Sequence, residues 1–111
     1  MKKDFCILSP AWGIKQIGLE DIPREYWIQR FWVLIDFLQR HRLTVRTLFL
    51  SKELIEDDSK LMFSDLSPQG FQVIELGLDN WSRANDSYSN YQKSGISIKP
   101  LENALSKLKN I

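Results

Sequence analysis

One stretch, residues 23–41 (PREYWIQRFWVLIDFLQRH), constrains the fold more than any other part of the chain. At about 100° per residue, its large apolar side chains recur at the spacing of an amphipathic helix. The inward face is expected to hold Trp27, Phe31, Leu34, Ile35 and Leu38, widened by Tyr26, Val33 and Phe37. The polar arc holds Arg24, Glu25, Gln29, Asp36, Gln39 and Arg40.

A helix this apolar cannot lie on a surface with only one side covered. Other segments must cover it on at least two sides, and a homodimer is the alternative way to cover it. The 111 residues fit one domain, and 43% apolar with 26% charged residues is the composition of a globular chain. We therefore expect one domain, residues 1–111, built around a central helix at about 23–41.

Three more helices are predicted from their start signals. Ser9-Pro10 and Ser67-Pro68 each place a capping hydroxyl before a proline at the first helical position. The first of these helices should end near residue 17, before Gly18. The second should span about 68–83, with apolar residues at helical spacing, and a last helix should begin at Pro100. The apolar stripe of the 68–83 helix is Phe71, Ile74, Leu78 and Trp81. That of the last helix is Leu101, Ala104, Leu105 and Leu108.

The remaining segments are less regular. Residues 1–8 are compatible with a tail or a short strand, and residues 44–50 (TVRTLFL) favour a short helix over a strand. Residues 51–64 read as a long connection pinned by apolar contacts, and residues 85–95 as a polar loop. The predicted fold class is all-α (mainly helical), a compact single-domain bundle.

Composition also restricts location. The longest unbroken apolar run, residues 31–35, is far shorter than the about 20 residues that span a bilayer. Asp4 and Ser9-Pro10 interrupt the first apolar stretch, so no secretory signal is predicted. A single cysteine fits a reducing compartment. We expect a cytoplasmic protein without a membrane partner.

No catalytic or metal constellation is predicted. Cys6 and His41 are too few for a structural zinc site, and nothing in the sequence places them together as a nucleophile and base. Glu56-Asp57-Asp58 lacks the glycine-centred loop of a calcium site. Glu75 and Asp79 share one helix side, but we expect that side to be solvated. The prediction is a protein that is not an enzyme and carries no catalytic residue, metal or cofactor.

Two charged clusters could serve binding. Arg40, His41, Arg42 and Arg46 gather at the end of the central helix and could contact phosphates, as in a small helical nucleic-acid-binding regulator. The helix C-terminus accounts for part of this charge, and the pI of about 7.8 is low for a DNA binder. Nucleic acid is therefore only the alternative interpretation.

An acidic cluster, made of Glu53, Glu56, Asp57, Asp58 and Asp65, follows directly along the chain. It would suit a basic protein partner. Two tyrosines in the expected 85–95 loop have the composition of a contact surface. Solvation of the carboxylates, and packing of the tyrosines on the core, are the competing explanations. The predicted partner-binding residues are Glu53, Glu56, Asp57, Asp58, Asp65, Tyr88 and Tyr91.

Several of these stretches resemble one family. Residues 64–71 (SDLSPQGF), then Asp79-Asn80-Trp81 and a final helix beginning Leu101-Glu102-Asn103-Ala104-Leu105, are similar to a "DLTxxG" helix start, an "xKW" turn and an "LExxLKK" helix. These features occur in small bacterial immunity proteins of contact-dependent growth inhibition toxin/immunity systems. The match covers about residues 20–108. Asn80 departs from the expected lysine, and the tyrosine-containing loop is longer.

The resemblance implies a protein that binds a cognate toxin and blocks its active site or an adjacent surface. If that toxin is a nuclease, its cleft is basic, and the acidic cluster is the natural counterpart.

Overall fold

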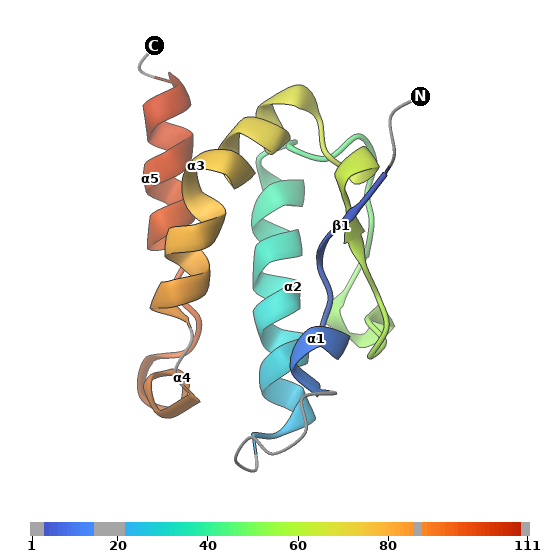
Figure 1. Cartoon of the computed structure of the whole chain (residues 1–111), viewed down its shortest axis with the longest axis vertical. Helices are drawn as coiled ribbons and strands as arrows, with labels where there is room; N and C mark the ends of the chain where they lie inside the picture. The colour runs from blue at the N-terminus through green and yellow to red at the C-terminus, as the bar shows by residue number, and fades with distance from the viewer. Residues whose placement is uncertain (1–3, 15–21, 86–87, 110–111) are drawn as a thin grey trace.

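The computed structural model describes residues 4–14, 22–85 and 88–109, with the side chains of 88–90 excepted. It shows a mainly helical fold with a small two-stranded sheet (Figure 1). The all-α prediction is therefore correct for the helices and wrong in omitting the sheet. The helices are α1 (Ala11–Ile14), α2 (Arg24–Arg40), α3 (Pro68–Ala84), α4 (Tyr88–Ser94) and α5 (Lys99–Lys109), with 3-10 turns η1 (Lys52–Leu54) and η2 (Phe63–Asp65). The strands are β1 (Cys6–Leu8) and β2 (Leu61–Met62).

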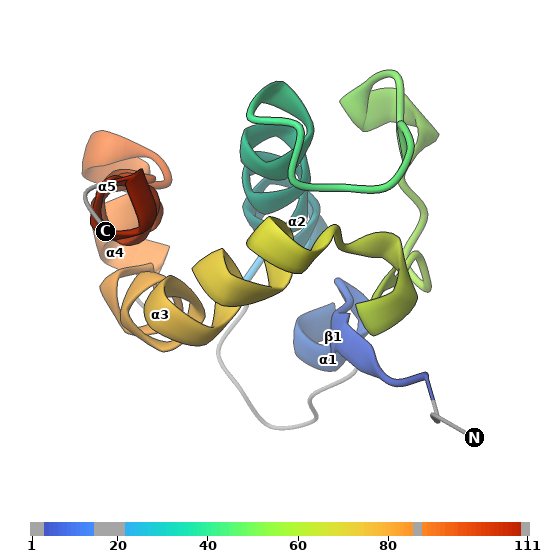
Figure 2. The same cartoon turned by 90° about the horizontal axis from the view of Figure 1, so that it is seen from above.

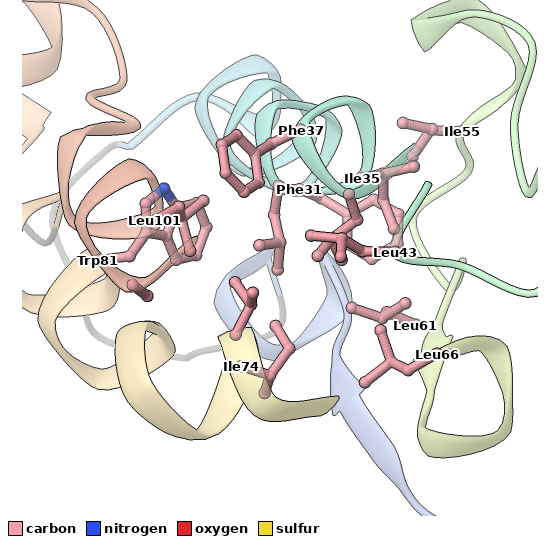
Figure 3. Close-up of a cluster of buried hydrophobic side chains, with 14 of the residues drawn as sticks. Phe31, Ile35, Phe37, Leu43, Ile55, Leu61, Leu66, Ile74, Trp81 and Leu101 are labelled. Carbon is pink, nitrogen blue, oxygen red and sulfur yellow. The ribbon is translucent and has the colours of Figure 1, made fainter. Parts of the chain in front are cut away.

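The predicted central helix is confirmed as α2, and other described segments cover it on two sides. In Figures 1 and 2, α3 and α5 lie on one side of α2, and β1, α1 and the 44–62 segment lie on the other. Leu34, Ile35 and Leu38 are fully buried, and Phe31 almost so. Figure 3 shows how α3, α5 and the connections meet this face, through Ile74, Trp81, Leu101, Leu43, Ile55, Leu61 and Leu66.

Helix α3 begins as the sequence predicts. The Ser67 hydroxyl accepts a hydrogen bond from the backbone amide of Gly70 at 3.1 Å, and Pro68 occupies the first turn. Gly70 is needed because a Cβ there would lie 2.0 Å from the carbonyl oxygen of Leu43. The segment after α2 thus packs directly on the first turn of α3. Helices α1 and α5 also start where predicted, whereas the expected end of α1 near residue 17 lies outside the described residues.

The short helix predicted at residues 44–50 is wrong. The segment is irregular and contains no helix: Thr44 forms a β-bridge with Leu66, and the amide of Val45 donates to the carbonyl of Asp65 at 2.9 Å. The side-chain amide of Gln39 holds the far end, because its oxygen accepts from the amides of Leu48 (2.6 Å) and Phe49 (2.9 Å). Its nitrogen donates back to the Phe49 carbonyl at 2.9 Å. These partners replace the hydrogen bonds that a helix would supply.

The loop predicted at residues 85–95 is also partly wrong, since residues 88–94 form α4. Gly95, at φ 75°, follows α4 in the left-handed conformation, and its amide donates to the carbonyl of Tyr91 at 2.8 Å. Asn85 ends α3 and is buried. Its side chain bonds the carbonyl of Trp81 and both backbone groups of Ser97, so it ties α3 to the approach of α5.

Of the two alternatives for residues 1–8, the strand is found at residues 6–8, while residues 1–3 lie outside the described part. Strand β1 pairs antiparallel with β2, with Cys6 opposite Met62 and Leu8 opposite Leu61. The pairing joins segments more than 50 residues apart and covers α2 on the side away from α5 (Figure 1).

Candidate protein-interaction surfaces

The acidic cluster lies largely on a projecting segment, residues 50–58, which we call the acidic loop. Glu53, Glu56 and Asp58 are exposed on it. Two leucines are exposed beside them: Leu50 at 84% and Leu54 at 55%. The acidic loop therefore exposes both leucines and carboxylates, and a combination of apolar and charged groups is usual in a protein interface.

Contacts to the body of the protein hold the acidic loop in place. Ile55 is buried in the core, and two ion pairs join the loop to the first turns of α2: Asp57 with Arg24, and Lys52 with Glu25. The Lys52 ammonium also donates to the Gln29 side chain at 3.1 Å. Asp57 is therefore engaged within the chain, whereas the described residues provide no ion pair for Glu53, Glu56 or Asp58.

Asp65 lies apart from this exposed surface, and its burial argues against its predicted role in partner binding. It is 5% exposed. Its carboxylate accepts a hydrogen bond from the amide of Met62 at 2.9 Å and pairs with Arg46 at 3.0 Å. The carboxylate thereby gives an acceptor to the partly buried amide of Met62, the residue that precedes η2.

The predicted tyrosines lie away from the acidic loop. They belong to α4, on the opposite side of α2 (Figure 1). Tyr91 is half-buried and packs edge-to-face on Tyr26 of α2, with ring centroids 5.1 Å apart. This contact agrees with packing on the core rather than with a free contact surface. The side chain of Tyr88 lies outside the described part.

The basic cluster is largely used within the chain. Arg40 pairs with Asp36 at 2.9 Å, and Arg46 pairs with the buried Asp65. The ring of His41 packs on Phe37 at 4.5 Å between centroids. Arg42 is exposed and ends α2 with a left-handed φ of 57°. The pairs lower the local positive charge, but the side chains of Arg40 and Arg46 stay 75% and 66% exposed, so nucleic acid remains the alternative interpretation.

A second feature was not predicted: a groove of about 480 Å³ between α3 on one side and β1 and α1 on the other, with α2 as its floor. We call it the α2–α3 groove. Glu75 and Asp79 of α3 line it and are exposed, as the sequence suggested. Trp12 of α1 also lines it and is 52% exposed. Its apolar lining is Ile7, Leu8, Trp27, Ile74, Leu78 and Trp81.

Arg30 lies at the floor of the α2–α3 groove and is only 8% exposed. Its guanidinium donates to the Ser82 hydroxyl at 2.7 Å and to the Asn85 carbonyl at 3.4 Å. It also lies 4.9 Å from the ring centroid of Trp81 and 6.0 Å from that of Trp27. The sequence did not predict the burial of Arg30, because its neighbours along the chain give no indication of the distant groups that bind its guanidinium.

The structure does not join Cys6 to His41. Cys6 lies in the sheet, where its thiol donates to the carbonyl of Leu8 at 3.4 Å and burial raises the pKa of the thiol. His41 lines a small pocket of about 150 Å³ beside Leu105, and Cys6 is not among the described residues that line it. Residues 4–14, 22–85 and 88–109 contain no cluster of three metal-binding side chains. None of their helices has the length and apolar character needed to cross a membrane.

Comparison of the chain with family models, curated proteins and solved structures found no match. The resemblance to immunity proteins therefore stands on the quoted sequence motifs alone. Those motifs correspond to the capped start of α3 and to helix α5 in the structure. Their residues stabilise the fold and do not form a catalytic or binding motif.

Proposed function

We propose that this protein is an immunity protein that binds a cognate bacterial toxin and neutralises it by covering the toxin's active site or an adjacent surface. The observation that carries the proposal is the acidic loop, which exposes two leucines together with Glu53, Glu56 and Asp58. Large exposed apolar side chains have a cost in water that burial against a partner removes. The family resemblance supports the same class of function.

The chemistry of the acidic loop favours a partner with a basic surface, such as the cleft of a nuclease. Opposite charges steer the encounter and raise the association rate, while burial of the exposed leucines slows dissociation. The ion pairs of Asp57 and Lys52 hold the loop before binding, so little ordering is required at the interface. The proposal assigns the protein a binding role in the cytoplasm, without catalysis or a cofactor.

The test co-expresses this chain with the C-terminal domain encoded by the reading frame next to it, which the proposal predicts to be a toxin. The first expected result is that the chain rescues cells from that toxin. A variant combining Glu53→Gln, Glu56→Gln and Asp58→Asn should then associate several-fold more slowly at low salt, with the difference shrinking as salt rises. A variant combining Leu50→Ala and Leu54→Ala should mainly dissociate faster.

Glu102→Gln is the matched control, because Glu102 is an exposed carboxylate on α5, away from the acidic loop (Figure 2). Its kinetics should equal those of the unchanged chain. Failure of the chain to protect cells or to bind the toxin domain rejects the function. Normal binding by both loop variants rejects the acidic loop as the interface.

A further inference from the structure

Among the described residues, one edge of strand β1 has no strand beside it. The sheet has two strands, so β1 pairs with β2 along a single edge. In Figures 1 and 2, β2 lies on the side of β1 away from α3, and the other edge of β1 faces α3 across the α2–α3 groove. Ile7 and Leu8 of β1 line that groove and are half-buried. An open strand edge presents backbone amides and carbonyls that a further strand can bind.

The backbone of Cys6 turns toward this open edge. The carbonyl of Phe5 accepts a hydrogen bond from the amide of Phe63 at 2.8 Å, so this carbonyl points to the β2 side. The peptide bonds of the described residues are trans, and in a trans peptide the next amide points the opposite way. The Cys6 amide therefore points away from β2. In an antiparallel ladder the carbonyl of the same residue points to the same edge, so Cys6 offers both a donor and an acceptor to the groove.

The charges of the α2–α3 groove disfavour a charged occupant. The guanidinium of Arg30 is buried at the floor and would repel a cation. The carboxylates of Glu75 and Asp79 are exposed on the α3 wall and would repel an anion. Trp81 also lines the groove, and its buried indole N–H has no acceptor among the described residues. A polypeptide backbone fits these conditions, because it is neutral and supplies carbonyl acceptors as well as amides.

We infer that the α2–α3 groove receives an extended, uncharged segment of a partner protein, which adds to the open edge of β1 as a third strand. The backbone of the segment bonds the amide and carbonyl of Cys6. Its apolar side chains lie against Trp12 and Leu78, which line the groove. Trp12 is 52% exposed, so this contact removes a large apolar surface from water.

A partner segment suits the groove better than a second copy of the chain does. The open edge of β1 is recessed behind α3, so the β1 edges of two copies cannot approach each other without a clash between their α3 helices. A segment that projects from another protein can enter the groove. The identification of that protein as the toxin rests on the proposed function, whereas the chemistry of the segment does not.

The groove can be tested without the toxin. The probe is the capped peptide Ac-Ser-Val-Leu-Val-Ser-NH2, titrated into the ¹⁵N-labelled full chain. It should give saturable shifts of the Cys6 amide and the Trp12 indole N–H, with a dissociation constant on the order of 1 mM, because β1 is short and offers few hydrogen bonds. Hydrogen exchange of the Cys6 amide should slow on binding. The Phe63 amide already bonds Phe5 and should keep its exchange rate. Peptides with lysine or glutamate in place of leucine should bind several-fold more weakly.

Two matched pairs separate strand addition from simple apolar contact. The same peptide with methyl groups on its three central amide nitrogens keeps its side chains but loses its backbone donors, and it should not bind. Cys6→Pro removes the amide at the open edge and leaves the pairing with β2, since proline is tolerated where the amide lies outside the ladder. This variant should lose the peptide, whereas Cys6→Ala should bind it unchanged. If Cys6→Pro fails to fold, the methylated peptide decides.

Four results would overturn the inference. They are the absence of a saturable shift at about 10 mM peptide, equal binding of the methylated peptide, unchanged binding by folded Cys6→Pro, and tighter binding of the lysine or glutamate peptide. Slow exchange of the Cys6 amide in a dimer of the free chain would also overturn it, in favour of a second copy. None of these touches the proposed function, which depends on toxin neutralisation. Conversely, peptide binding by a chain that neutralises no toxin would reject the proposed function and leave strand addition established.

Discussion

Replacing Gln39 by alanine should release the segment that leads into the acidic loop. The Gln39 side chain makes three hydrogen bonds to that segment, two from the amides of Leu48 and Phe49 and one to the carbonyl of Phe49. A hydrogen bond of this kind contributes about 0.5–1.5 kcal/mol net. Three of them, on a half-buried side chain, predict a loss of about 2 kcal/mol in the free energy of unfolding.

Two measurements check this prediction. Urea denaturation gives the free energy of unfolding, and hydrogen exchange gives the protection of the Leu48 and Phe49 amides. Both amides should exchange faster in Gln39→Ala by more than the global loss of stability explains, because their acceptor is removed. Affinity for the toxin that we propose as partner should also fall, since Leu50 follows directly and the loosened loop must be ordered on binding.

Gln29→Ala is the matched control. Gln29 lies on the same helix, is also half-buried and accepts a single hydrogen bond, from Lys52 at 3.1 Å. Its replacement should cost less than that of Gln39, about 1 kcal/mol, because Lys52 keeps its ion pair with Glu25 when the Gln29 side chain is removed. The reasoning is refuted if Gln39→Ala costs no more than Gln29→Ala, or if the Leu48 and Phe49 amides keep their protection.

Two further predictions concern packing and titration. Gly77→Ala should destabilise the chain by about 1–2 kcal/mol in urea denaturation, because overpacking outweighs the helix propensity that alanine adds; the new Cβ would lie 2.9 Å from that of Ala104 on α5. An unchanged or higher stability would contradict the close approach of α3 and α5. The Ser64 hydroxyl and amide hold the pKa of Asp4 below its usual 3.8, so Ser64→Ala should raise that pKa in an NMR titration. A depressed pKa stabilises the fold above the pKa of the unfolded chain, and the contribution fades as pH falls through the folded pKa; an unmoved pKa in Ser64→Ala would contradict this contact.

The sequence predicted the helices that carry their own signals. For α2, apolar spacing decides the helix and its buried face. For α3, a serine cap, a proline and apolar spacing all lie within the segment itself. The acidic loop was also predicted as a charged surface, because Glu53, Glu56 and Asp58 are neighbours along the chain. Such features depend on residues a few positions apart, and their physics is local.

Only the tertiary structure decided the features whose partners are distant in sequence. β1 becomes a strand because β2 supplies its hydrogen bonds. Residues 44–50 stay out of a helix because Gln39 and Leu66 provide partners for them. Asp65 is internal because Arg46 and the start of η2 satisfy its charge. Arg30 is buried because Ser82, Asn85 and two indoles surround it. A polar group is buried where the fold supplies partners for it, and the spacing of residues along the chain does not specify those partners.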